Sequence, residues 1–210
     1  MSTRENPVLI EGPSGPLEAL HLDQPDAHGV AIICHPHPLF DGTMHNKVIS
    51  TLQRTVRDAG FSTLRFNFRG VGQSAGSYGE GAGEIDDAYA AAQWLIRQHP
   101  GVPLTVMGFS FGACVAGCLA GRLEGDGQAL TRLFMLAPSV ERFDIEGKLP
   151  LRCPLTVIQP EADEVVTPEK VYAWSEALQQ RHELIKVPEC SHFFHGKLTD
   201  LKALVQPRLD

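Results

Sequence analysis

Residues 108–112 read Gly-Phe-Ser-Phe-Gly, a G-x-S-x-G pattern with Ser110 at its centre. An apolar stretch, residues 102–107, precedes the pattern, and a stretch of small apolar residues, 113–120, follows it. This order predicts a strand, a tight turn and a helix, with the serine hydroxyl exposed at the tip of the turn on a strained backbone. Glycine suits both ends of so sharp a bend, because a side chain at either position would collide across it. An ordinary strand-to-helix loop is the alternative interpretation.

A serine hydroxyl is a poor nucleophile at neutral pH, so it needs a base, and the base needs a partner that fixes its tautomer. Asp163 and then His192 follow Ser110 along the chain, each after an apolar stretch that predicts a strand. We therefore expect Asp163 to be the acid and His192 the base of a nucleophilic serine. The sequence holds rivals for both roles, namely Glu161, Glu164 and Asp144 for the acid and His195 for the base.

Attack on a carbonyl group also requires N–H donors for the oxyanion that develops. The first donor should be the N–H of Phe111, which would open the helix after the serine. The second should come from the loop after the apolar run 30–34, whose prolines have no N–H. His37 and Leu39 remain as alternatives. A zinc site built from His35, His37 and His45 is a weak competitor, since no carboxylate or cysteine stands at a familiar zinc spacing, and we expect no metal.

Strand-like and helix-like patterns alternate along the chain after an opening hairpin, and no linker divides the sequence, so we expect one domain spanning residues 1–210. This alternation predicts a mainly parallel sheet covered by helices on both faces. Ligands bind at the carboxyl ends of the strands in such sheets, which would bring Ser110, Asp163 and His192 to one edge. The expected strands are 7–12, 16–22, 30–34, 61–68, 102–107, 133–137, 155–158 and 183–187, and the expected helices are 48–59, 85–96, 113–120, 168–178 and 197–205.

Composition narrows the classes of function. The formal net charge of −7 and the lack of any Lys/Arg cluster argue against a nucleic-acid partner. No apolar run approaches the ~20 residues that span a membrane, and residues 1–7 lack a hydrophobic signal core. The five cysteines have no disulfide-rich spacing and indicate reduced thiols in a cytoplasmic protein. Cys114 and Cys118 are interpreted as small buried residues of a helix rather than as a metal pair.

Several motifs together resemble those of a known family. Residues 34–40 (Cys-His-Pro-His-Pro-Leu-Phe) and 42–48 (Gly-Thr-Met-His-Asn-Lys-Val) resemble the marker segments of small bacterial hydrolases related to dienelactone hydrolases. Residues 66–74 resemble the glycine-rich turn after the fourth strand of the α/β-hydrolase superfamily, 108–113 its nucleophile elbow, and 190–196 the histidine loop of the group. The resemblance implies a three-layer α/β-hydrolase fold, with an eight-stranded, mostly parallel sheet and a Ser110-Asp163-His192 triad.

The sequence departs from this family pattern at two points. Asp41 stands where the group has glycine, which would alter the charge at the mouth of the site. Dienelactone hydrolases use a cysteine nucleophile, so Ser110 argues against that substrate.

Only about 17 residues separate Ala137 from Leu155, and three prolines interrupt them, so we expect no lid domain and an open cleft.

The expected activity is hydrolysis of a small carboxylic ester through an acyl-enzyme, with no cofactor. A peptidase, a thioesterase or an acyltransferase would use the same residues, and a non-catalytic scaffold protein is the alternative from another class. Sequence leaves the natural substrate and the oligomeric state open. Leu39, Phe40, Val165, Val166 and Phe193 are the expected apolar wall, of which Phe40, Val165 and Phe193 are the predicted substrate-binding residues.

Overall fold

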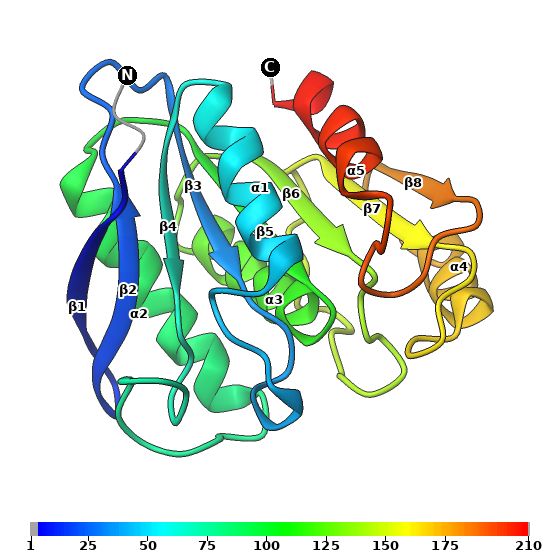
Figure 1. The fold of residues 1–210 in the computed structure, drawn as a ribbon, viewed down its shortest axis with the longest axis horizontal. Helices are drawn as coiled ribbons and strands as arrows, with labels where there is room; N and C mark the ends of the chain where they lie inside the picture. Colours follow the sequence, from blue (N-terminus) through cyan, green and yellow to red (C-terminus); the bar gives the residue numbers. More distant parts are fainter. Residues whose placement is uncertain (1–3, 210) are drawn as a thin grey trace.

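The computed structural model describes residues 4–209. Residues 1–3 and 210, which the sequence analysis included in the single domain, lie outside the described residues. Within this part of the chain, eight strands form one sheet in the order β1-β2-β4-β3-β5-β6-β7-β8 (Figure 1). Their bounds are β1 Asn6–Gly12, β2 Gly15–Leu22, β3 Gly29–Cys34, β4 Phe61–Phe66, β5 Leu104–Phe109, β6 Leu130–Leu136, β7 Leu155–Pro160 and β8 His182–Val187. β1, β2 and β4 pair antiparallel, whereas all pairings from β4 through β3 to β8 are parallel, which confirms the predicted sheet.

Helices cover both faces of this sheet (Figure 1). The helices α1 (Lys47–Asp58) and α5 (Leu198–Val205) pack on one face, and α2 (Ala82–Gln98), α3 (Phe111–Gly125) and α4 (Pro168–Glu176) on the other. Successive side chains of a strand point to opposite faces. Accordingly, Val30, Ile32 and Cys34 of β3 join the core under α2 and α3, and Ala31 and Ile33 join the core under α1 and α5. A strand buried on both faces needs such a continuous apolar run, which is the pattern that the sequence shows.

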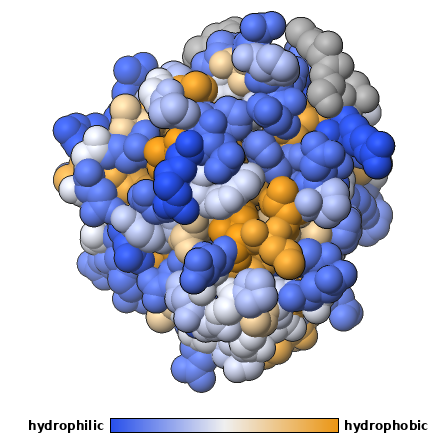
Figure 2. All heavy atoms as spheres, turned by 90° about the vertical axis from the view of Figure 1, so that its left-hand side faces the viewer, coloured by the Kyte–Doolittle hydropathy of each residue, from blue (hydrophilic) through white to orange (hydrophobic). Residues whose placement is uncertain are grey.

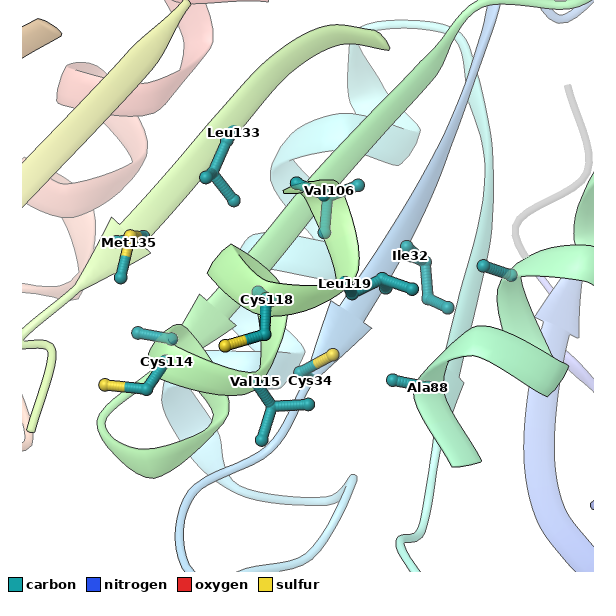
Figure 3. Packing of buried hydrophobic residues seen from close by; sticks show 14 of the residues in the cluster. Ile32, Cys34, Ala88, Val106, Cys114, Val115, Cys118, Leu119, Leu133 and Met135 are labelled. Atoms are coloured by element: carbon teal, nitrogen blue, oxygen red, sulfur yellow. The ribbon is translucent and has the colours of Figure 1, made fainter. Parts of the chain in front are cut away.

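The cysteines are part of the apolar core. Cys34, Cys114 and Cys118 lie among aliphatic side chains of β3, β5, β6 and α3 (Figure 3). All five cysteines are buried and free. Burial raises the pKa of the Cys114 thiol to about 12 and that of Cys118 to about 11, so both stay protonated and apolar at neutral pH. Their interpretation as packed small residues is confirmed.

A few element boundaries differ from the sequence expectation. The strand expected to reach residue 68 ends at Phe66, and α4 ends at Glu176, so Leu178 lies beyond the helix although it still packs against the core. Thr167 occupies the N-cap position of α4, but its hydroxyl donates to Glu141 at 3.2 Å instead of capping the helix. Local propensity alone does not reveal this competing tertiary partner.

The surface on the β1 side of the molecule is mainly hydrophilic and carries an apolar area surrounded by polar side chains (Figure 2). Leu9 of the edge strand β1 is one of the exposed large apolar residues, with 66% of its surface accessible. Among the described residues, no helix is both long and apolar enough to cross a bilayer.

Candidate active site

Ser110 stands at the bend between β5 and α3. Its φ of 58° and ψ of −120° place it in a region that residues with a side chain rarely adopt. The Ser110 N–H donates to Leu136 O of β6 at 2.8 Å, which ties the bend to the sheet. A Cβ atom at Gly108 would meet the backbone of Gly112, and one at Gly112 would meet the backbone at Cys34 and His35. Both glycines are therefore required by close backbone approach, as the motif predicts.

Three side chains from distant parts of the sequence meet at this bend. Ser110 Oγ lies 3.1 Å from His192 Nε2, and His192 Nδ1 lies 2.8 Å from Asp163 Oδ2. Ser110 follows β5, Asp163 follows β7 and His192 follows β8, so all three lie at the carboxyl edge of the sheet. The side chain of His192 is 2% exposed and that of Asp163 is completely buried. The structure thus brings together the three residues singled out from the sequence.

The charge on Asp163 is stabilised by fixed donors. The N–H groups of Val165 and Val166 donate to Oδ1 at 2.9 and 2.8 Å. Burial by itself would raise the pKa of Asp163, but His192 and these N–H groups outweigh it and hold the pKa below its ordinary value. Asp163 is consequently a carboxylate at neutral pH and can only accept hydrogen bonds. A neutral His192 must then carry its proton on Nδ1, which leaves Nε2 free to accept from the Ser110 hydroxyl.

Gln159 is a further partner of Asp163 that sequence analysis missed. This residue of β7 is completely buried, and its Nε2 donates to Asp163 Oδ2 at 3.2 Å and to Pro160 O at 3.0 Å. Gln159 therefore helps to fix the oxygen that faces His192. The only sequence signal is a polar residue at the end of an apolar strand, which does not distinguish a buried amide from the start of a loop.

The rival residues lie apart from the imidazole or support it indirectly. Glu164 Oε2 accepts the backbone N–H of His192 at 3.0 Å, so it positions the histidine loop. Asp144 is exposed and pairs with Lys148 at 3.1 Å. Glu161 and His195 are exposed. Within residues 4–209, Asp163 alone among these carboxylates bonds to the His192 ring.

The loop after β3 leads into a short 3-10 helix, η1 (Pro38–Phe40), at the mouth of the site. The Leu39 N–H donates to His37 Nδ1 at 3.2 Å, and the Leu39 side chain is 65% exposed and lies outside the cavity lining. The expectation that Leu39 donates to an oxyanion or forms the apolar wall is therefore corrected. By contrast, the N–H groups of His37 and Phe111 have no protein acceptor in the described part of the chain.

Two histidines and a tyrosine hold this loop in place. His35 Nδ1 donates to Pro36 O at 2.6 Å, and His35 Nε2 accepts the Phe68 N–H at 3.0 Å. Burial lowers the pKa of His35 to about 3, so the ring stays neutral and keeps both bonds. His37 Nε2 lies 3.2 Å from the Tyr78 hydroxyl, a contact that sequence analysis did not foresee. Both ring nitrogens of His35 are in use, and the described residues contain no group of three metal-ligating side chains.

The backbone conformation of Asp41, directly after η1, explains why the similar hydrolases have glycine at this position. Its φ is 58°, in the left-handed region that glycine adopts freely and that aspartate tolerates better than most residues. A Cβ at the following Gly42 would meet the carbonyl oxygens of Pro36 and His37. The backbone of this loop is thus constrained on both sides of the bend, and Asp41 places a carboxylate at the cavity rim.

A cavity of about 970 Å³ opens over Ser110 and His192. Phe40, Val165, Val166 and Phe193 line it, as expected of the apolar wall. The connection between β6 and β7 supplies a further wall with no lid domain. The residues of this connection that line the cavity are Ser139, Arg142, Phe143, Asp144 and Lys148.

Comparison with known proteins places this chain in a family. The Thioesterase domain family model matches residues 78–186, just over half of the chain. The crystal structure of XC6422 from Xanthomonas campestris, described as an α/β serine hydrolase without a lid, is 41% identical with a TM-score of 0.90 over 100% of this chain and 95% of that chain. An α-β serine hydrolase homologue from Coxiella burnetii is 34% identical, with a TM-score of 0.89 and full coverage of both chains. An uncharacterised protein of Rickettsia prowazekii, RP471, is 29% identical over 96% of this chain and 87% of its own length.

The protein therefore has the fold of an α/β serine hydrolase without a lid. The chain belongs to the α/β-hydrolase superfamily, as its motifs indicated.

Substitution of Gly112 tests whether close packing fixes the serine bend. Gly112→Ala should lower the free energy of unfolding by about 1–3 kcal/mol or more, because the new methyl group meets the backbone after β3. Gly125→Ala in the same helix has open space around it and should stabilise by up to about 1 kcal/mol. Urea unfolding measures both values. Equal stability of the two variants would contradict the packing argument.

Proposed function

We propose that this protein is a carboxylic-ester hydrolase that works through an acyl-enzyme, with Ser110 as nucleophile, His192 as base and Asp163 as the residue that orients the imidazole. The observation that carries the proposal is the unbroken hydrogen-bonded chain from Ser110 Oγ to the buried carboxylate of Asp163. This chain is what a serine needs to become a nucleophile at neutral pH.

In the first half of the proposed reaction, Ser110 Oγ attacks the ester carbonyl while its proton passes to His192 Nε2. The N–H groups of Phe111 and His37 stabilise the oxyanion, since both are free of protein acceptors among the described residues. The C–O bond then breaks, and His192 gives the proton to the departing alcohol. Water repeats these steps on the acyl-enzyme, which releases the carboxylic acid and restores Ser110. The steps use only the chain, a small-molecule substrate and water, so we expect no cofactor.

Labelling with a fluorophosphonate tests the role of Ser110. The wild-type protein should be phosphonylated on Ser110, and Ser110→Ala should lose both the label and ester hydrolysis, with kcat reduced at least about 10⁴-fold. Ser14→Ala, at an exposed serine of the β1–β2 turn, serves as the control and should label normally. Intact-mass spectrometry reads the label. A well-folded wild-type protein that does not label would instead support a non-catalytic scaffold.

The cavity predicts a preference among acyl chains. It is open to solvent and has the charged side chains of Asp41, Arg142 and Lys148 around it, which favours a small acyl group over a long aliphatic one. Across p-nitrophenyl esters, kcat/KM should be highest for short acyl chains and should fall as the chain lengthens. Fastest turnover of the long-chain esters would contradict this expectation.

A thioesterase is the second candidate, because the Thioesterase domain family model matches this chain. Ethyl esters and ethyl thioesters of the same acid separate the two candidates when each kcat/KM is divided by the rate constant of its hydroxide-catalysed hydrolysis. A larger normalised value for the oxygen ester is expected under our proposal. A larger value for the thioester would replace it with thioester hydrolysis by the same residues.

A further inference from the structure

Five ring side chains form a continuous aromatic wall on one side of the cavity. The wall consists of His37, Phe40, Tyr78, Phe111 and Phe143, all of which line the cavity. The His37 ring is central, with centroid distances of 4.9 Å to Phe40, 5.0 Å to Tyr78 and 4.7 Å to Phe111. Phe143 extends the wall at 5.3 Å from Phe111. These rings come from three different connections of the fold and from the first residue of α3, so the wall is a tertiary feature and not a local sequence motif.

Core packing explains only part of this wall. Phe111 is 4% exposed and belongs to the larger core, but Phe40 is 76% exposed and contacts the wall from one side only. An apolar ring at the mouth of a site gains stability when a ligand removes it from water. Aromatic side chains also bind an aromatic ring more strongly than an aliphatic group of equal size. The reason is that offset and edge-to-face contacts stabilise the pair beyond the burial of apolar area.

The position of the aromatic wall indicates which part of the ester it contacts, the acyl group or the leaving alcohol. The leaving alcohol must lie beside His192, which protonates it, and the aromatic neighbours of His192 are Phe109 and Phe193, at centroid distances of 4.9 and 5.0 Å. Neither belongs to the aromatic wall. The wall is instead formed around the side chains of His37 and Phe111, whose N–H groups face the ester carbonyl in the proposed reaction. The acyl group therefore extends over the wall.

We propose that the preferred substrates are esters of arylalkanoic acids, whose ring packs against the aromatic wall formed by His37, Phe40, Tyr78, Phe111 and Phe143. The inference rests on the proposed ester hydrolysis at Ser110 and names its substrate class. It also accounts for the exposed ring of Phe40, which the substrate ring covers.

A matched pair of substrates tests this inference. Ethyl 3-phenylpropanoate and ethyl 3-cyclohexylpropanoate have the same alcohol, the same chain and a similar ring size, and two methylene groups insulate each carbonyl from its ring. The wild-type enzyme should show a kcat/KM about 2–13-fold higher for the phenyl ester, the range that aromatic pairing contributes beyond area burial. Proton release in weakly buffered solution measures hydrolysis of both esters.

Two variants locate the effect. Phe40→Leu keeps an apolar side chain of similar size at the mouth and should bring the phenyl/cyclohexyl ratio toward one, while fluorophosphonate labelling of Ser110 persists. Leu9→Ala removes an exposed apolar side chain from β1, away from the site, and should leave the ratio at its wild-type value.

The possible outcomes distinguish the substrate class from the proposed function. A phenyl/cyclohexyl ratio of one or less in the wild-type enzyme overturns the inference but not the assignment of Ser110 as nucleophile. The same holds if the enzyme labels but hydrolyses neither ester. A high ratio that survives in Phe40→Leu overturns the assignment to the wall. Wild-type protein that neither labels nor hydrolyses either ester overturns the proposed function and this inference together.

Discussion

The hydrogen bond between Asp163 and His192 is the contact on which the chemistry of the site depends. It joins two side chains that are almost completely removed from water, at 2.8 Å. A buried carboxylate persists only when donors surround it, and Asp163 has the N–H groups of Val165 and Val166 on its other oxygen. Because its charge is fixed, the proton of the imidazole is fixed on Nδ1. The remaining nitrogen is thereby left to accept from Ser110.

The fold places Asp163, His192 and Ser110 at the same edge of the sheet. Parallel strands β5, β7 and β8 end on the same side of the sheet, so the residues after them converge although the chain between them is long. Ser110 is held in a strained conformation by the sheet on one side and by closely packed glycines on the other. The loop after β3 carries no regular strand pairing, and the neutral ring of His35 holds it by bonds to two backbone groups. Rigidity around the serine thus comes from close contacts and hydrogen bonds to backbone groups.

Sequence alone predicted the sheet, both helical layers and the convergence of Ser110, Asp163 and His192, because each depends on local pattern and on the order of elements. It did not find Gln159, whose buried amide donates to Asp163 four residues further on, or Tyr78, whose partner His37 lies on another connection. Neither contact leaves a periodic signal in the sequence. Sequence also left the choice between His37 and Leu39 open, because that choice depends on which backbone N–H is already hydrogen-bonded within the loop. Thr167 stands at the N-cap position of α4, but its hydroxyl donates to Glu141 instead of capping the helix. Sequence pattern therefore predicts the elements of this protein but not the individual hydrogen-bond partners of its polar groups, whether these partners are local or distant.

The contacts of His192 require the tautomer that carries its proton on Nδ1, facing Asp163, and that leaves Nε2 to accept from Ser110. Nitrogen-15 NMR of histidine-labelled protein reports this directly, with the His192 signals assigned by their loss in His192→Gln. In the uncharged imidazole we expect a protonated Nδ1 and an unprotonated Nε2, an arrangement that should be lost in Asp163→Ala. An uncharged His192 that carries its proton on Nε2, or a tautomer unaffected by removal of the Asp163 carboxylate, would show that Asp163 does not set the tautomer.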